Sequence, residues 1–219
     1  KDTEKVVKEF QKAYGLVVNG ILDEVSLNVL KNEVAKRKVI KPIKIFIDPG
    51  HGGTDPGAKH GNTLEKTLTL DIAKRIVEYL NQYQGIEIKM SRTSDKTVSL
   101  SQRTKMANDW GADYFVSVHI NAGGGTGFES FIYNSPTRDE INKQNIIHDH
   151  IVKNIDVRDR GKKRANFHVL RESNMSAILL EYLFIDNTSD RNKLLNKSYR
   201  DRLARLTAEG IAKAFNLKK

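Results

Sequence analysis

The chain has 219 residues, of which 38% are hydrophobic and 29% are charged, and its formal net charge is +10. This composition is typical of a globular protein, and the length allows one full domain and a small second one. No apolar run approaches the ~20 residues that a membrane-spanning helix needs. The first residues run into a helical pattern and carry no signal-peptide pattern.

The sequence contains no cysteine. Disulfide bonds, cysteine-ligated zinc and cysteine nucleophiles are therefore excluded, and any metal must be held by His, Asp or Glu. The positive charge favours a polyanionic partner such as an anionic wall polymer, although the basic clusters at residues 36–38 and 158–164 could equally form a solvated face. Because no nucleic-acid-binding motif occurs, and basic residues are not interleaved with aromatic ones, we expect no nucleic-acid partner.

The first forty residues predict a small helical unit. Residues 4 to about 31 predict two short helices, and Asp23 can cap the second one. A unit of this size buries little apolar surface by itself, so a helical hairpin packed on the main domain is one interpretation. Residues 33–41 are mostly charged and predict a linker, with a domain boundary near Pro42.

From residue 43 onward, strand and helix patterns alternate. This order predicts an α/β fold with a mostly parallel central sheet and helices on both faces, preceded by the small helical module. Strand 128–133 is expected at the edge of the sheet. The predicted strands are residues 43–48, 86–91, 114–119, 128–133, 167–170 and 176–182, and the predicted helices are residues 65–82, 100–110, 138–155 and 199–215.

Four side chains with catalytic potential occur where the predicted elements meet. His51 follows the first strand in a glycine-lined loop, His119 ends the third strand, and Glu181 lies near the end of the last one. Glu65 begins the first long helix of the main domain. Because ligands of α/β proteins bind beyond the carboxyl ends of parallel strands, we expect these four side chains to converge. The glycines around His51 are expected to leave room for a water or a substrate carbonyl.

Two imidazoles and one carboxylate are a common ligand set for catalytic zinc, with the fourth position left for water. A further carboxylate is then needed to carry the proton of that water to the leaving nitrogen. Structural interpretations compete with these roles, since His51 could be a hydrogen-bonding loop residue and Glu65 could complement a helix dipole. Glu181 follows an apolar run, and a buried carboxylate needs a partner or titrates abnormally, which suggests a site. The other histidines are interpreted as surface or loop groups: His60, His148, His150 and His168.

Several motifs follow one another in order along residues 43–217. They are Ile47-Asp48-Pro49-Gly50-His51-Gly52-Gly53, Glu65-Lys66, Ser91-Arg92-Thr93-Ser94-Asp95, Ser117-Val118-His119-Ile120-Asn121-Ala122, Val169-Leu170-Arg171-Glu172 and Leu180-Glu181. Together they strongly resemble the zinc-dependent N-acetylmuramoyl-L-alanine amidases, in particular the bacillar sporulation and phage-lysin type. The resemblance implies hydrolysis of the amide bond between N-acetylmuramic acid and L-alanine in peptidoglycan.

The resemblance also implies roles for particular residues. It implies zinc bound by His51, Glu65 and His119, with Glu181 as the catalytic general base and acid. From their places in the motifs, Asn121 and Arg171 could bind substrate, although structural hydrogen bonding explains them equally well.

The N-terminal residues show a second resemblance. Phe10-Gln11, Gly15-Leu16 and Asn19-Gly20 resemble the later helices of the peptidoglycan-binding module of wall hydrolases. We therefore expect a partial peptidoglycan-binding-like module and linker at residues 1–38 and a zinc amidase domain at residues 43–217. The resemblance implies peptidoglycan as the partner and a place at the cell wall or outside the cell, and the positive charge adds anionic wall polymers as a further expected partner.

Two residues depart from the family pattern. Ser176 stands where the family usually has Pro, and Leu183 stands where it usually has Gly, so Leu183 is expected to place bulk beside the site. This departure leaves open a protein that binds the wall without catalysis on a degenerate amidase fold. A third interpretation is a zinc peptidase that cuts within the stem peptide.

Overall fold

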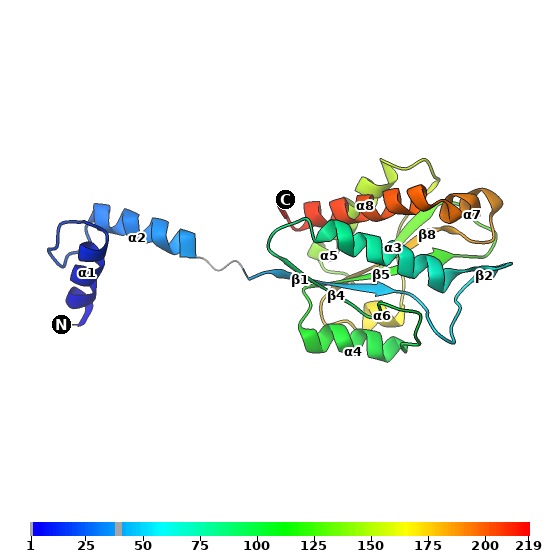
Figure 1. Ribbon diagram of the computed structural model, residues 1–219, viewed down its shortest axis with the longest axis horizontal. Coiled ribbons are helices and arrows are strands. Elements are labelled where there is room, and N and C mark those ends of the chain that lie inside the picture. The colour runs from blue at the N-terminus through cyan, green and yellow to red at the C-terminus, as the bar shows by residue number, and fades with distance from the viewer. Residues whose placement is uncertain (1, 38–40) are drawn as a thin grey trace. The chain divides into compact units, whose positions relative to one another are not determined.

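A computed structural model describes residues 2–37 and 41–219 of the chain (Figure 1). These residues form two compact units, Lys1–Lys41 and Pro42–Lys219. No helix in the described ranges is long and apolar enough to cross a membrane.

The first unit consists of α1 (Asp2–Ala13) and α2 (Glu24–Arg37). The turn between them is organised around the buried side chain of Gln11. Its Nε2 donates to Oδ1 of Asn19 at 2.8 Å, and its Oε1 accepts from the backbone nitrogens of Asn19 and Gly20 at 3.1 and 2.9 Å. A buried amide that loses its partners is costly, so these bonds fix the turn.

Helix α2 is longer than the sequence pattern predicts. Asp23 accepts a hydrogen bond from the backbone nitrogen of Ser26 at 2.8 Å, as expected of a helix-capping residue. The helix continues to Arg37, so the prediction of a linker starting at residue 33 is wrong, because its Glu, Ala, Lys and Arg residues favour helix. Residues 38–40 of that linker, and the side chains of the basic cluster at residues 36–38, lie outside the described residues.

The second unit is built on a six-stranded sheet in the order β4-β1-β5-β8-β6-β7. The strands β4, β1, β5 and β8 are parallel, β6 is antiparallel to β8, and β7 is parallel to β6. The predicted α/β fold with a mostly parallel sheet is therefore confirmed. The strands are β1 (Ile43–Pro49), β4 (Ile86–Met90), β5 (Tyr114–Asn121), β6 (Phe128–Ile132), β7 (Asp159–Arg164) and β8 (Ser176–Phe184).

Helices cover both faces of this sheet, as predicted. Figure 1 shows α3, α5 and α8 on one face and α4 and α6 on the other. A hairpin of β2 (Lys59–His60) and β3 (Thr63–Leu64) precedes α3. The helices are α3 (Glu65–Leu80), α4 (Leu100–Trp110), α5 (Arg138–Val152), α6 (His168–Arg171), α7 (Thr188–Leu195) and α8 (Lys197–Ala214).

Alternate residues of the central strands enter two separate cores. In β1, Ile45 and Ile47 belong to the large cluster that includes residues of α3 and α8. Phe46, between them, belongs to the smaller cluster with Phe115 and with Ala107 of α4. Because successive strand residues point to opposite faces, a strand with helices on both sides buries consecutive residues, which explains the apolar run at residues 45–47.

Two strand predictions are wrong. Strand β6 was expected at the edge of the sheet, but β7 pairs with its free side and forms the edge instead. β7 has the sequence Asp-Arg-Gly-Lys-Lys-Arg. Charged residues are common on edge strands, but such a sequence lacks the alternation of apolar and polar residues by which a strand is predicted. Residues 167–170 were expected as a strand, but they enter the short helix α6, where the carbonyl of Phe167 accepts from the backbone nitrogens of Leu170 and Arg171.

Candidate active site

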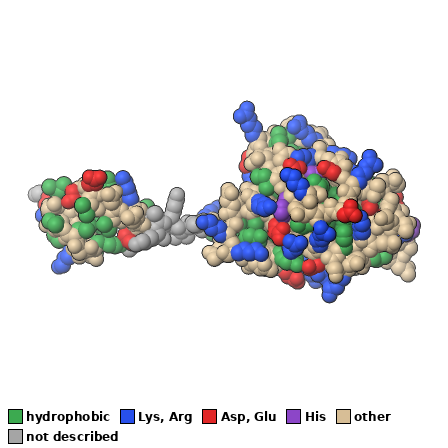
Figure 2. All heavy atoms as spheres, turned by 90° about the horizontal axis from the view of Figure 1, so that it is seen from above, with side chains coloured by type: hydrophobic (Ala, Val, Ile, Leu, Met, Phe, Trp, Pro, Cys, Tyr) green, Lys and Arg blue, Asp and Glu red, His purple; other side chains and the backbone are tan. Residues whose placement is uncertain are grey.

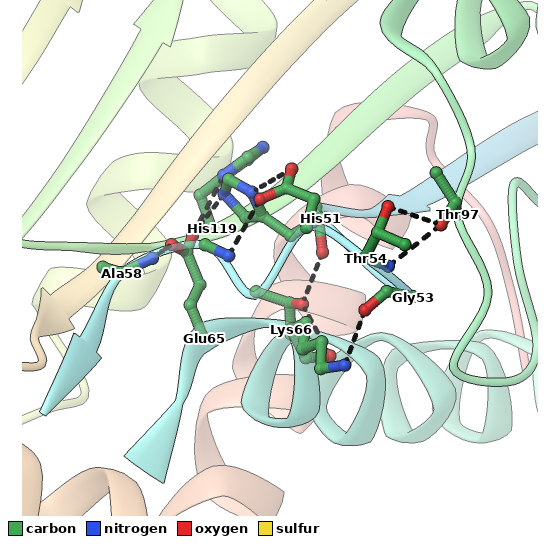
Figure 3. A network of polar contacts seen from close by, with 12 residues as sticks. His51, Gly53, Thr54, Ala58, Glu65, Lys66, Thr97 and His119 are labelled. Carbon is green, nitrogen blue, oxygen red and sulfur yellow. Dashed lines mark hydrogen bonds and ion pairs between the residues drawn. The ribbon is translucent and has the colours of Figure 1, made fainter. Parts of the chain in front are cut away.

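The carboxyl ends of β1 and β5 bring two histidines to the start of α3 (Figure 3). Nε2 of His51 lies 3.2 Å from Oε1 of Glu65, and Nδ1 of His119 lies 3.1 Å from the same oxygen. One ligand atom from each residue lies within 4.8 Å of the others, which makes this group a candidate metal site in the described part of the chain. We call these three residues the His-Glu-His cluster.

The donor set of this cluster fits zinc. Tetrahedral zinc with bonds of about 2.0–2.2 Å places its ligand atoms roughly 3.3 Å apart, close to the separations between the imidazole nitrogens and Oε1 of Glu65. Glu65 is only 3% exposed. Its Oε1 accepts from the backbone nitrogen of Ile120 at 2.9 Å and its Oε2 from that of Ala58 at 2.7 Å. The backbone of strand β5 and that of the loop before β2 therefore hold this carboxylate in place.

Glycines allow the three side chains to approach one another. A Cβ atom on Gly50 would overlap the imidazole ring of His119, and a Cβ on Gly57 would overlap the side chains of Glu65 and His51. The space beside Gly50 therefore holds the His119 ring, rather than being left free for a substrate group as the sequence pattern led us to expect.

Asp55 orients the imidazole of His51. Its Oδ2 lies 2.8 Å from Nδ1 of His51, which leaves Nε2 facing Glu65. A carboxylate behind an imidazole in this way fixes the tautomer and the direction of a metal ligand. Sequence reasoning assigned no role to Asp55, although it lies four residues after His51 in the same motif.

Neighbouring charges and hydrogen bonds shift the pKa values of all three residues of the cluster. Burial acts to lower the pKa of His51, but Glu65 and Asp55 outweigh it and raise the pKa. The pKa of His119 is likewise raised, because Glu65 and the charge of Glu181 outweigh burial. Burial acts to raise the pKa of Glu65, but hydrogen bonds from both imidazoles hold it far below its usual value.

Two buried arginines hold the loop that carries His51. Arg103 donates from Nη1 to Oδ1 of Asp48 at 2.6 Å and from Nη2 to the carbonyl oxygen of His51 at 2.7 Å. Arg92 donates from Nη2 to the carbonyl oxygen of Gly50 at 2.8 Å. His51 has a φ of 61°, in the left-handed region that non-glycine residues rarely adopt. The arginines therefore fix a strained turn at His51.

A second set of bonds ties this loop to residues 94–97. Nζ of Lys66 donates to the carbonyl oxygen of Gly53 and to Oδ2 of Asp95, both at 2.8 Å, and Oδ1 of Asp95 accepts from the nitrogen of Gly53 at 2.7 Å. Oγ1 of Thr97 accepts from the nitrogen of Thr54 at 3.0 Å (Figure 3). We call Lys66 and Asp95 the Gly53 clamp.

Glu181 lies on β8 directly opposite His119 of β5. Its Oε2 is buried and has no hydrogen-bond partner among the described residues. Burial is the main cause that raises the pKa of Glu181 to about 7, against the charge of His119. A carboxyl group that titrates near neutral pH can both accept and donate a proton during a reaction.

Asn121 and Arg171 have structural partners. Nδ2 of Asn121 donates to Oε1 of Glu129 at 2.6 Å. Arg171 donates from Nε to Oε1 of Glu172 at 2.7 Å and from Nη1 to Oδ1 of Asn166 at 2.8 Å. A cleft of about 460 Å³ opens at the His-Glu-His cluster and is lined by His51, His119 and Glu181, but not by Arg171. The role of Asn121 and Arg171 in binding substrate stays a prediction.

Two histidines differ from their interpretation as surface or loop groups. His148 is fully buried, and its ring nitrogens lie 2.9 Å from Oγ of Ser130 and 2.9 Å from Oδ1 of Asp159. It thereby links α5 to β6 and β7. His168 lines the cleft at the His-Glu-His cluster. His60 is exposed in the β2–β3 hairpin, as expected.

Leu183 does not place bulk beside the site, so that expectation is wrong. Its side chain is fully buried in the large core cluster, and it does not line the cleft at the His-Glu-His cluster. Its φ of 65° lies in the left-handed region, where glycine is favoured. The backbone conformation therefore explains why a glycine suits this position.

The mostly parallel sheet, the His-Glu-His cluster at its carboxyl end and the carboxyl group of Glu181 beside it are typical of a metal-dependent hydrolase built on an α/β fold. The family model of N-acetylmuramoyl-L-alanine amidase matches residues 45–213, and the chain belongs to this family. A model of a peptidoglycan binding domain matches residues 1–30. Both resemblances drawn from the sequence motifs are therefore confirmed.

Named relatives and solved structures agree with the family. The chain is 55% identical over 178 residues to the sporulation-specific N-acetylmuramoyl-L-alanine amidase of Bacillus subtilis, covering 81% of this chain and 70% of the relative. It is 41% identical over 181 residues to the endolysin of Bacillus phage SPP1, covering 80% and 67%. The crystal structure of N-acetylmuramoyl-L-alanine amidase from Clostridium difficile 630 superposes with a TM-score of 0.78 at 39% identity, covering 80% of this chain and 98% of that one.

Proposed function

We propose that the chain hydrolyses the amide bond between N-acetylmuramic acid and L-alanine in peptidoglycan, with zinc held by His51, Glu65 and His119. The observation that carries this proposal is the convergence of these three side chains beside the unpartnered Glu181, in a member of the amidase family. When bound, zinc would polarise the scissile carbonyl and activate a water.

The residues of the chain supply the proton transfers. Glu181 takes the proton of the attacking water and passes it to the nitrogen of the leaving L-alanine. Its pKa of about 7, raised chiefly by burial, suits both halves of this transfer. Asp55 keeps the His51 imidazole directed towards the metal position.

We further propose that residues 1–38 form a wall-binding module and residues 43–217 the catalytic domain, acting at the cell wall or outside the cell. Figure 2 shows Lys and Arg side chains spread, with Asp and Glu among them, over the visible face of the second unit. With the net charge of +10, this surface supports attraction to anionic wall polymers.

The test is the release of L-alanine amino groups from purified peptidoglycan. We expect release with zinc, loss of activity after chelation and recovery when zinc is restored. The variant Glu181→Ala should retain one zinc per chain while kcat falls by about three orders of magnitude. Activity in fully zinc-free protein would contradict the proposal. Wall binding without any hydrolysis would indicate a degenerate fold, and fragments cut within the stem peptide would indicate a peptidase.

A further inference from the structure

Two adjoining hollows lie on the side of the second unit that α5 and α8 cover, opposite to α4 and α6 (Figure 1). The larger one, of about 480 Å³, is lined by Tyr83 and by residues between 209 and 218. The smaller one, of about 310 Å³, is lined mainly by residues between 145 and 153. His150 and Lys213 line both, and neither hollow shares a residue with the cleft at the His-Glu-His cluster. We call the pair the α5–α8 hollows.

The imidazole of His150 holds the ammonium group of Lys213 between the two hollows. Nδ1 of His150 lies 2.9 Å from Nζ of Lys213, and its Nε2 lies 3.0 Å from Oε2 of Glu209. Because an ammonium group can only donate, Nδ1 must accept, and the ring proton is on Nε2, which donates to Glu209. The imidazole is therefore neutral, so it fixes the position of Lys213 without neutralising its charge.

Two further lysines stand on either side of Lys213. Lys153 lines the smaller hollow and Lys218 lines the larger one. In the described part of the chain, no carboxylate lies within salt-bridge distance of any of these three ammonium groups. Charges of one sign along a concave surface attract ligands of the opposite sign. The α5–α8 hollows therefore favour an anion, and the row of three lysines favours one whose charges repeat along a chain.

The carboxylates at the hollows do not cancel this positive charge. Glu209 accepts from Nη1 of Arg205 at 2.8 Å as well as from His150. Asp149 accepts from Nζ of Lys162 at 2.9 Å. Arg205 and Lys162 do not line either hollow. Each carboxylate is thus paired with a basic side chain from outside, and the three lysines remain in excess.

The lining of the hollows suits a hydrated polymer rather than a lipid surface. A protein that binds a membrane surface usually buries apolar side chains between the lipids. In the described part of the second unit, the exposed large hydrophobic side chains are Leu100, Phe167 and Leu195, and none of them lines either hollow. The amides of Asn145 and Asn216 line the hollows instead. An amide can donate to phosphate oxygens and accept from hydroxyl groups.

We infer that the α5–α8 hollows bind an anionic wall polymer built of polyol units joined by phosphodiesters. Its successive phosphates lie against Lys153, Lys213 and Lys218, and its hydroxyl groups lie against Asn145 and Asn216. Such a site holds the second unit on the wall while the cleft at the His-Glu-His cluster stays free. The inference rests on the proposed place of the protein at the cell wall and is independent of the amidase reaction.

The test is a titration of the full chain with purified poly(glycerol phosphate) in about 0.05 M salt, where charge interactions are weakly screened. We expect a variant that lacks the three lysines of the hollows to bind at least about tenfold more weakly, and its affinity to depend less steeply on salt. Lys213→Arg keeps the charge and should bind within about threefold of wild type. The triple variant carries Lys153→Gln, Lys213→Gln and Lys218→Gln.

A second triple variant is the matched control, because it removes the same charge from exposed positions that do not line the hollows. Its affinity should stay within about threefold of wild type. Equal weakening in the two triple variants would show that net charge alone attracts the polymer, and would overturn the inference. The control carries Lys59→Gln, Lys74→Gln and Lys197→Gln.

Two further measurements separate the polymer from other partners and from the reaction. Binding of the wild-type chain to phosphatidylglycerol vesicles, without binding to the polymer, would identify a lipid surface and overturn the inference. On wall stripped of anionic polymer, the triple variant of the hollows should release L-alanine amino groups as fast as wild type, because the hollows lie outside the cleft. If wild type released none from any wall, the proposed amidase function would fail, while the titration would still decide what the hollows bind.

Discussion

The buried carboxyl group of Glu181 is useful for proton transfer but unfavourable for folding when it is ionised. Its folded-state pKa of about 7 lies above the ordinary value of 4.5, chiefly because it is buried. Below pH 4.5 the group is protonated in both the folded and unfolded states, and it costs nothing. Between pH 4.5 and about 7 the group ionises in the unfolded state but stays protonated in the folded state, so stability is lost across this window, and above pH 7 the loss is complete.

We therefore expect Glu181→Gln to stabilise the metal-free protein at pH 8 by up to about 3 kcal/mol, and by much less at pH 5. The measurement is the free energy of unfolding in urea at the two pH values. Glu87→Gln, at an exposed position of β4, is the control and should show no such difference. Equal effects of Glu181→Gln at pH 5 and pH 8 would show that the pKa of Glu181 is not raised.

Leu183 combines two opposed contributions to stability. Its buried side chain fills the large core, while its φ of 65° is strained for any residue except glycine. We expect Leu183→Gly and Leu183→Ala both to destabilise the protein by about 2–4 kcal/mol, because both remove a buried side chain.

At most buried positions glycine is the worse of these two replacements by about 1 kcal/mol, but here Leu183→Gly should be at least as stable as Leu183→Ala. Denaturant midpoints measure this order. kcat should stay within about twofold of wild type in both variants, because the side chain does not line the cleft. A clear loss of kcat in a folded variant would argue that Leu183 shapes the site after all.

At the scale of elements, the loops at the carboxyl ends of β1 and β4 act as one unit. The Gly53 clamp fixes both backbone polar groups of Gly53, two residues from His51 and two from Asp55. A loose loop would let Asp55 and His51 separate. Losing a residue that hydrogen-bonds a metal ligand commonly lowers the affinity for the metal by about 10–100-fold.

We accordingly expect Lys66→Met to weaken zinc binding by about tenfold or more, as measured by competition with a chelator of known affinity. Lys105→Met removes an exposed ion pair with Asp109 on α4 and is the matched control, with no expected effect on zinc. Wild-type affinity in Lys66→Met would mean that the arginines and Thr97 hold the loop without the clamp.

The three strands that are buried on both faces were all predicted from sequence patterns. β1, β5 and β8 each contain an apolar run, residues 45–47, 114–116 and 177–180, because helices cover both of their sides. β7 escaped prediction because an edge strand needs no apolar alternation, and α6 because four residues are too few to show a helical period.

Site residues, too, could be identified only where the local sequence has a recognisable pattern. His51, His119 and Glu181 could be identified because each follows or ends an apolar strand in the sequence. Arg92 and Arg103 could not, because the carbonyl oxygens to which they donate lie far away along the chain and leave no local pattern.

At the scale of the whole molecule, each unit contains its own set of buried contacts. We expect a chain reduced to residues 42–219 to fold and to keep its kcat/KM on a soluble muramoyl-peptide within about twofold. Binding to insoluble wall should weaken, because the unit that matches a peptidoglycan binding domain is removed.

Sedimentation with purified wall measures this binding. Binding of the full chain should also fall between 0.05 and 0.5 M salt, roughly as the Debye length shortens, because of the net charge of +10. Equal sedimentation of the two chains would show that the first unit contributes no wall binding.

The overlap between the missing side chain of Gly50 and the ring of His119 has an evolutionary consequence. The two positions lie far apart in the sequence, yet any residue with a Cβ at position 50 would displace the imidazole. A related gene could keep His51, Glu65 and His119 and still lose their arrangement through this one substitution. Position 50 is therefore a diagnostic for separating active copies from decayed ones in genomes, where an inspection of the ligands alone would count both as enzymes.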